Sequence, residues 1–102
     1  MDKLTMMPVE ITLYDENDEP IQTYSKSVVR WGILKQAIKL SKSLEESKNG
    51  FDDDCFDAVS AFVCRLFDDK FTPHELEDGA DVTEIMACFT QVIRRANVMG
   101  NA

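Results

Sequence analysis

The organisation of this chain is decided by the stretch Phe71-Thr72-Pro73-His74-Glu75-Leu76-Glu77-Asp78-Gly79. Thr72 and Glu75 have the spacing of a capping box, in which each side chain accepts a hydrogen bond from the other residue's backbone N–H. Pro73 suits the first position of a helix, and Gly79 can end one. The stretch therefore predicts a short helix between two longer ones.

The residues before this stretch predict a long helix in the centre of the fold. Asp52 is a suitable N-cap, Asp53 and Asp54 suit the positive end of the helix dipole, and Phe51 and Phe56 have the spacing of a hydrophobic staple. Apolar residues then recur at steps of three and four, which is typical of a core helix. They are Cys55, Phe56, Val59, Phe62, Val63, Leu66 and Phe67.

The residues after the stretch predict the last long helix. Asp81 is a suitable N-cap and stands three residues before Glu84, while Arg94 and Arg95 fall in the final turns, where cations favour the dipole. The apolar positions of this helix are Ile85, Met86, Cys88, Phe89, Val92, Ile93 and Ala96.

The first residues of the chain predict a β-hairpin over residues 9–24. Residues 9–13 alternate between apolar and polar, residues 15–20 form a polar turn cluster, and residues 21–24 offer a shorter second strand. Because an isolated hairpin is only marginally stable, we expect it to pack on the helices that follow.

A first helix is predicted over residues 28–47, ending at Lys48-Asn49-Gly50, and its apolar positions form two seams. One seam consists of Ile33, Ala37, Leu40 and Leu44. The other consists of Trp31, Leu34 and Ile38, with Lys35 and Lys42 beside it. Either this helix is held on two sides, by the hairpin and by the later helices, or the second seam stays partly open for a partner.

These elements predict an α+β, mainly helical fold, with an N-terminal β-hairpin packed on three main helices and one short helix. We expect one domain over residues 1–102, with a helical core over residues 28–99 and flexible ends at residues 1–7 and 100–102.

Composition limits the class of protein. The net charge is −8, which argues against nucleic acid as a partner, and no apolar run approaches the length needed to cross a membrane. The first residues lack the apolar region of a signal peptide. The three cysteines stand at apolar helix positions, which suits a reducing cytosol.

The charge is unevenly distributed along the chain. Residues 1–50 contain eight acidic and seven basic residues, whereas residues 51–102 contain eleven acidic and four basic residues. Five bases occur between Lys26 and Lys42 with no acid among them. This pattern is compatible with solvated faces, and also with electrostatic attraction between copies that would favour a homo-oligomer.

We expect no catalytic residues, no cofactor and no metal. His74 is the only histidine, and the cysteine spacings match no zinc pattern. The acidic cluster at residues 15–20 fails as a calcium loop, because Pro20 stands where glycine is required and Lys26 where a bidentate glutamate belongs. The four glycines are too far apart for a phosphate-binding loop.

The run from Phe67 to Gly79 resembles a signature of the tail assembly chaperones of long-tailed (siphovirus-type) phages and prophages of Gram-positive bacteria. In that family a helix leads through a short turn and a Phe-Thr segment into a short acidic helix, an Asp-Gly pair and a final amphipathic helix. The hairpin and the basic helix from Arg30 to Lys42 are also similar, so the resemblance covers residues 9–99. One departure is the turn at residues 68–70, where the family often has glycine.

The resemblance implies a non-catalytic function in the host bacterial cytoplasm. It implies that the protein binds the tape measure protein, keeps it soluble, helps to recruit subunits of the major tail protein, and is absent from the mature virion. Many relatives also have a longer form made by ribosomal frameshifting. The alternatives are a generic acidic helical adaptor or regulatory protein, and a structural virion component such as a connector or tail protein.

We predict that the partner binds at the open seam formed by Trp31, Leu34 and Ile38, or at the Phe89 side of the last helix. The wide apolar arc of the first helix motivates this prediction.

Overall fold

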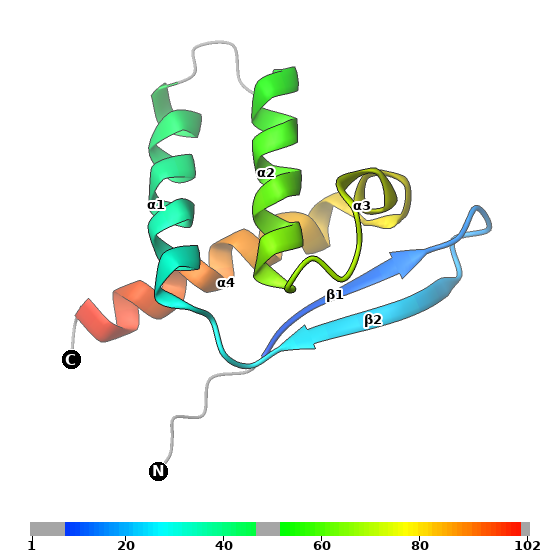
Figure 1. Cartoon of the computed structure of the whole chain (residues 1–102), viewed down its shortest axis with the longest axis horizontal. Helices are drawn as coiled ribbons and strands as arrows, with labels where there is room; N and C mark the ends of the chain where they lie inside the picture. The colour runs from blue at the N-terminus through cyan, green and yellow to red at the C-terminus, as the bar shows by residue number, and fades with distance from the viewer. Residues whose placement is uncertain (1–7, 47–51, 101–102) are drawn as a thin grey trace.

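The computed structural model describes residues 8–46 and 52–100, with side chains up to residue 95. The elements follow in the order β1 (Val9–Tyr14), β2 (Pro20–Lys26), α1 (Trp31–Glu46), α2 (Asp53–Leu66), α3 (Pro73–Gly79) and α4 (Val82–Gly100). The predicted α+β, mainly helical fold is confirmed. α1 and α2 stand side by side and antiparallel, α4 crosses behind them, and the hairpin lies below α3 (Figure 1).

The hairpin confirms the predicted strands. β1 and β2 pair antiparallel, with Val9 opposite Lys26 and Thr12 opposite Thr23. In the loop, Asp15 Oδ1 accepts hydrogen bonds from the backbone N–H groups of Asn17 (2.8 Å) and Glu19 (3.0 Å). This local bonding by an aspartate is what fixes many polar turns.

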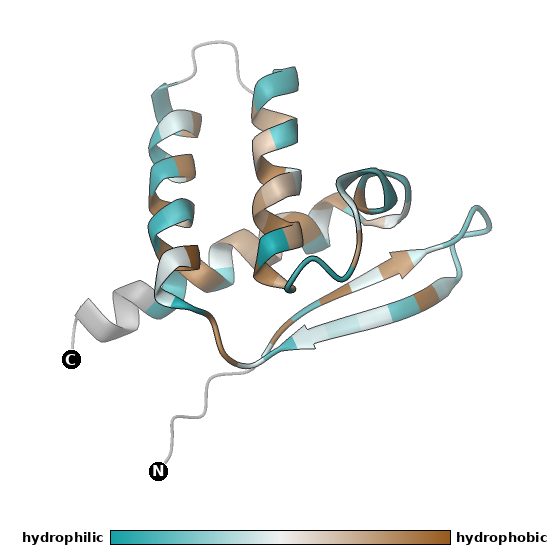
Figure 2. Ribbon diagram, in the orientation of Figure 1, coloured by the Kyte–Doolittle hydropathy of each residue, from teal (hydrophilic) through white to brown (hydrophobic). Residues whose placement is uncertain are grey.

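The core lies where one face of β1 meets the helices. Val9 and Ile11 are fully buried on β1, and Figure 2 shows the hydrophobic side of α1 turned toward α2. Aromatic rings connect the elements: Phe62 of α2 and Phe89 of α4 meet edge to face with centroids 5.7 Å apart, and Tyr24 of β2 meets Phe71 at 4.9 Å. Such pairs stabilise a core beyond the area that they bury.

The predicted helix starts are confirmed at α2 and α3. Asp52 Oδ1 accepts from the backbone N–H of Cys55 at 2.9 Å. The capping box of α3 is complete, because Glu75 N–H donates to Thr72 Oγ1 (3.1 Å) and Thr72 N–H donates to Glu75 Oε1 (2.9 Å). The proposed staple partner Phe51 and the predicted end of α1 at residues 48–50 lie outside the described residues.

α4 begins as predicted, but Glu84 has a different role from a capping residue. Asp81 caps the helix, since its Oδ2 accepts from the Thr83 N–H at 2.9 Å. Glu84 instead turns to the hairpin, where its Oε1 accepts from the Thr12 N–H (2.9 Å) and its Oε2 accepts from the Tyr14 hydroxyl (2.7 Å).

The edge of β1 that faces away from β2 is therefore covered. Besides the two bonds to Glu84, Leu13 forms an isolated antiparallel bridge with Ala80, and the Cys88 thiol donates to the Glu10 carbonyl at 3.4 Å. Gly79 also lies tight against this strand, since a Cβ atom there would stand 3.1 Å from the Tyr14 carbonyl oxygen. A strand edge that is paired or covered in this way cannot recruit another strand.

The predicted start of α1 is wrong, and the structure decides against one of the two alternatives for its second seam. The helix begins at Trp31, three residues later than predicted, because the Arg30 carbonyl accepts the first helical bond from Ile33 (3.0 Å) and the β-branched Val28 and Val29 stay in the connector. The hairpin also does not hold the second seam of α1. α1 packs on α2 and α4, whereas β1 packs on α3 and α4.

The ends of the chain are only partly described. Residues 1–7, predicted to be flexible, lie outside the described residues, as do residues 101 and 102. α4 continues through Gly100, the first residue of the predicted frayed end.

The turn after α2 has a backbone conformation that favours glycine. Asp68 and Asp69 both have left-handed backbone conformations, with φ of 61° and 58°. The Asp69 N–H donates to the Cys64 carbonyl at 2.8 Å, and Lys26 Nζ contacts Asp68 Oδ2 at 2.5 Å. Glycine adopts this conformation without a steric cost, whereas an aspartate here must be held by its neighbours.

We expect Asp69→Gly to raise the free energy of unfolding by about 0.5–1 kcal/mol, because glycine relieves the left-handed strain while the backbone bond to Cys64 remains. Urea unfolding monitored by circular dichroism measures this. The control is Asp53→Gly, which places glycine inside the first turn of α2 and should destabilise. If both variants destabilise equally, the strain argument is wrong.

We expect Glu84→Ala to destabilise the fold by about 1–3 kcal/mol, because the backbone N–H of Thr12 loses its acceptor in a partly buried position. Glu77→Ala, which removes an exposed glutamate from α3, is the control and should lie within about 0.5 kcal/mol of the wild type. The measurement is again the urea midpoint. Equal midpoints for the two variants would show that Glu84 does not anchor the hairpin.

Candidate partner-binding site

The outer face of α1 carries an apolar stripe that the rest of the described chain leaves open. Trp31 is 75% exposed and Ile38 is 41% exposed, while Leu34 is half-buried and packs against the core. These three residues stand at helical spacings of three and four, so they share one face. We call them the Trp31 seam.

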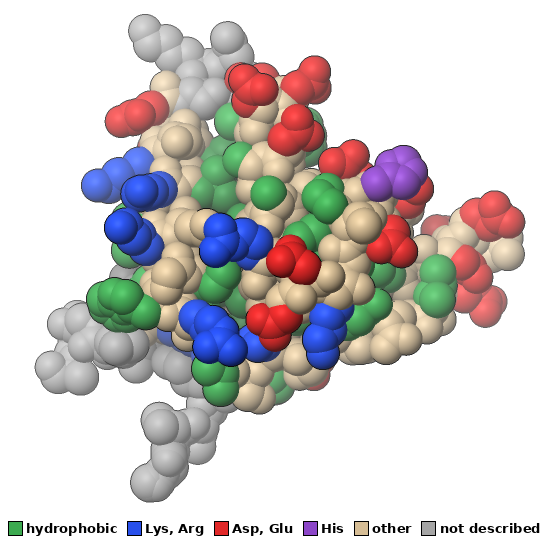
Figure 3. Space-filling model, in the orientation of Figure 1, with side chains coloured by type: hydrophobic (Ala, Val, Ile, Leu, Met, Phe, Trp, Pro, Cys, Tyr) green, Lys and Arg blue, Asp and Glu red, His purple; other side chains and the backbone are tan. Residues whose placement is uncertain are grey.

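The seam is bordered by cations. Lys35, Lys39 and Lys42 are exposed on the same helix. Figure 3 shows Lys and Arg side chains gathered over α1, whereas Asp and Glu side chains gather over the start of α2, over α3 and at the hairpin tip. The uneven charge seen along the sequence is thus also an uneven charge on this face of the molecule.

The fourth predicted residue, Phe89, lies elsewhere. It is 9% exposed and packs edge to face on Phe62, so it belongs to the core beneath the surface. The structure therefore places Trp31, Leu34 and Ile38 on one helix face and Phe89 in the buried core.

A second apolar surface is missing from the sequence prediction. A groove with a volume of ≈ 830 Å³ lies between α2, α3 and α4, and we call it the α2–α3–α4 groove. Its apolar lining includes Phe56, Val59, Leu76, Val82 and Ile85. Its acidic lining consists of Asp53, Asp57 and Glu77.

Phe56 and Val82 are the most exposed apolar residues of this groove. Phe56 is 57% exposed and Val82 is 77% exposed. The prediction that Phe56 is a core residue is therefore wrong. Its place in the first turn of α2, near the open end of the groove, leaves the ring accessible, although its helical spacing matches that of the buried Val59 and Val63. Periodicity identifies a helix face but not how far along the helix that face is covered.

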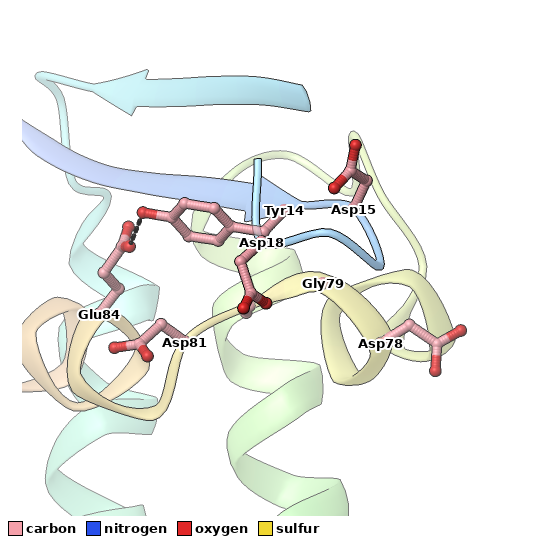
Figure 4. Close-up of a pocket in the computed structure, with 8 residues that line it drawn as sticks. Tyr14, Asp15, Asp18, Asp78, Gly79, Asp81 and Glu84 are labelled. Carbon is pink, nitrogen blue, oxygen red and sulfur yellow. Dashed lines mark hydrogen bonds between the residues drawn. The ribbon is translucent and has the colours of Figure 1, made fainter. Parts of the chain in front are cut away.

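A second concavity lies at the hairpin tip and is strongly acidic. It has a volume of ≈ 440 Å³, and its acidic lining consists of Asp15, Asp18, Asp78, Asp81 and Glu84. Figure 4 shows that Asp15 and Asp78 point away from the other carboxylates, while Glu84 is engaged by Tyr14. Among the described residues, no group of three or more such side chains is arranged to hold a metal ion.

The hydrogen bond from Tyr14 to Glu84 raises the pKa of the Tyr14 hydroxyl, and desolvation and the negative charges of Glu84 and Asp81 act in the same direction. The carboxylate favours the protonated phenol, because a phenolate would face it as a like charge. This cleft is thus explained by its role in holding the hairpin on α4.

The thiols and the histidine of the described residues offer no reactive arrangement. Burial raises the pKa of Cys64 to about 11 and that of Cys88 to about 12, which keeps both thiols protonated at neutral pH. His74 is exposed on α3, and its Nε2 lies 3.3 Å from Asp78 Oδ2. Within the described residues, no helix has the length and apolar character of a membrane span.

Residues 6–101 match the model of a family described as phage tail chaperone protein. No curated protein and no solved structure matches the chain.

We expect the raised pKa of Tyr14 to make the hairpin contact sensitive to alkali. The folded pKa lies above the unfolded value, so the contribution of the bond is complete below the unfolded pKa and is lost as pH rises through the folded pKa. Tyrosinate absorbance in a pH titration measures this. In Glu84→Gln, one tyrosine should titrate at lower pH than in the wild type, and in Tyr14→Phe that transition should disappear. Identical titrations of wild type and Glu84→Gln would contradict the assignment.

Proposed function

Because the chain belongs to the phage tail chaperone protein family, we propose that it binds the tape measure protein during tail assembly, keeps it soluble and helps to recruit subunits of the major tail protein. This role is non-catalytic. It is carried out in the cytoplasm of the host bacterium, and the protein is absent from the mature virion.

The observation that supports this proposal most directly is the exposure of the Trp31 seam. An exposed tryptophan and isoleucine on one helix face are a common form of protein-binding surface, because tryptophan contributes a large buried area with few rotamers to fix. A tape measure protein is long and helical, so an apolar stripe on its surface can pack along such a seam as one helix packs on another.

The charge of the chain supports the solubilising part of the role. A complex that carries the −8 charge of each bound copy repels other complexes of the same kind. Added acidic residues also favour solubility more than added basic ones. Covering an apolar stripe of the client with an acidic protein therefore opposes aggregation in two ways, by burial and by repulsion.

We expect Trp31→Asp and Ile38→Asp to reduce the soluble amount of a co-expressed tape measure fragment, because each places a charge in the apolar contact. The measurement is the ratio of soluble to insoluble fragment. Ser43→Asp adds the same charge to an exposed position of α1 outside the seam, and it should behave like the wild type.

Circular dichroism and the urea midpoint of each variant separate binding from folding. Because Trp31 is largely exposed, Trp31→Asp should unfold at nearly the wild-type midpoint. A folded Trp31→Asp variant that keeps the fragment as soluble as the wild type does would show that the seam is not the client site.

A further inference from the structure

The α2–α3–α4 groove and the Trp31 seam are complementary in shape and in charge. The groove is concave and apolar, with Asp53, Asp57 and Glu77 among its lining. The seam stands out from a convex helix face, and Lys35, Lys39 and Lys42 are exposed beside it. Each surface thus has an apolar centre with three charged residues, which are acidic at the groove and basic at the seam.

The two surfaces of one chain cannot meet each other. α2 lies between α1 and α3, packing on both (Figure 1). The seam occupies the exposed face of α1, whereas the groove lies beyond α2, where α2 meets α3 and α4. Any contact between seam and groove must therefore join two molecules.

We propose that the α2–α3–α4 groove is occupied by the Trp31 seam of a second copy of this chain. Trp31 and Ile38 enter the apolar groove beside Phe56 and Val82. The lysines beside the seam face the acidic groove residues. The occupant is identified by charge complementarity, because both halves of the contact are present on this chain with matching apolar centres and opposite charges.

The size of the groove agrees with this occupant. Its ≈ 830 Å³ lies in the upper part of the range of protein pockets that take whole ligands, so it accommodates more than one side chain. A tryptophan with an isoleucine seven positions later on the same helix offers two anchors along one line. The exposed position of Val82 at the start of α4 leaves the groove accessible from outside.

The contact is heterologous, since different surfaces of the two copies meet. A copy that inserts its seam into a neighbour still has an empty groove. A copy that accepts a neighbour's seam still has its own seam exposed. Such contacts produce rings or open helical chains rather than closed two-fold dimers. The state of association must then depend on protein concentration and, because much of the attraction is between exposed charges, on salt.

One consequence rests on the proposed function. Since the seam is also the proposed client surface, a bound client competes with self-association. The apolar seam is then covered by another copy in the absence of a client, and is released when the client is present in excess.

The test is analytical ultracentrifugation of the purified chain over a range of concentrations at low and high salt. The wild type should increase in average mass with concentration and dissociate as salt is raised. Trp31→Asp removes the seam anchor, and Val82→Lys places a cation in the apolar part of the groove, where Trp31 and Ile38 would enter. Each variant should weaken association about thirtyfold, as for loss of an interface hot spot.

Mixing the two variants gives the sharpest result. The intact seam of Val82→Lys can still enter the intact groove of Trp31→Asp, but the resulting pair has no further working surface. An equal mixture should therefore form dimers and stop there. Ser43→Asp, outside the seam, and Glu16→Lys, an exposed acid outside the groove, are the matched controls and should associate like the wild type.

The proposal is overturned if the wild type stays monomeric at all concentrations, or if the mixed variants do not pair. If the wild type is monomeric and Val82→Lys instead lowers the solubility of the tape measure fragment, the groove holds the client and not a second copy. If the wild type self-associates as expected but both variants keep the tape measure fragment as soluble as the wild type does, the result counts against the proposed function alone.

Discussion

The two hydrogen bonds accepted by Glu84 fix the position of the hairpin on α4. They join the backbone of Thr12 and the hydroxyl of Tyr14, both on β1, to the first turn of α4. A two-stranded hairpin has too little core of its own to be stable, so its position depends on what holds it. Glu84, the Leu13–Ala80 bridge and the Cys88 thiol hold it along one edge, against α3 and α4.

This placement of the hairpin decides which surfaces remain open. Because β1 packs on α3 and α4, it does not cover the outer face of α1. The apolar face of α1 that the core does use contains Ile33, Ala37 and Leu40, all buried. Trp31 and Ile38 are left exposed as a result, so the open seam follows from where a carboxylate on another helix anchors the hairpin.

The sequence predicts local features of this fold well and distant ones poorly. The Thr72–Glu75 capping box, the Asp52 cap and the alternation of residues 9–13 involve neighbours within a few positions, and the structure contains all three. Glu84 is different, because its partner Thr12 is 72 positions away and its spacing from Asp81 suggests a local cap instead. Local rules describe what a residue can do alone, and tertiary packing chooses among the possibilities.

The same limit applies to the candidate site. Trp31, Leu34 and Ile38 share a helix face by their spacing alone, so the seam is predictable as a face. Phe56 and Phe89 show what spacing leaves open, since both occupy apolar helix positions, yet one is 57% exposed and the other 9%. Whether an apolar position is covered depends on which other element reaches that turn, and the first turn of α2 lines a groove instead of the core.

The acidic start of α2 illustrates how one sequence feature can serve folding and recognition together. Asp52, Asp53 and Asp54 suit the positive end of the helix dipole. Asp52 also caps the helix directly, and the hydrogen bond from the backbone N–H of Cys55 lowers the pKa of its carboxyl group. Because these acids must lie at the first turn, they also place negative charge beside the exposed ring of Phe56. Asp57 and Glu77 extend that charge along the groove.

α1 has no acid in its first turn and carries lysines along its exposed face. The groove is therefore bordered by negative charge and the Trp31 seam by positive charge. This complementarity is what allows one copy of the chain to recognise another.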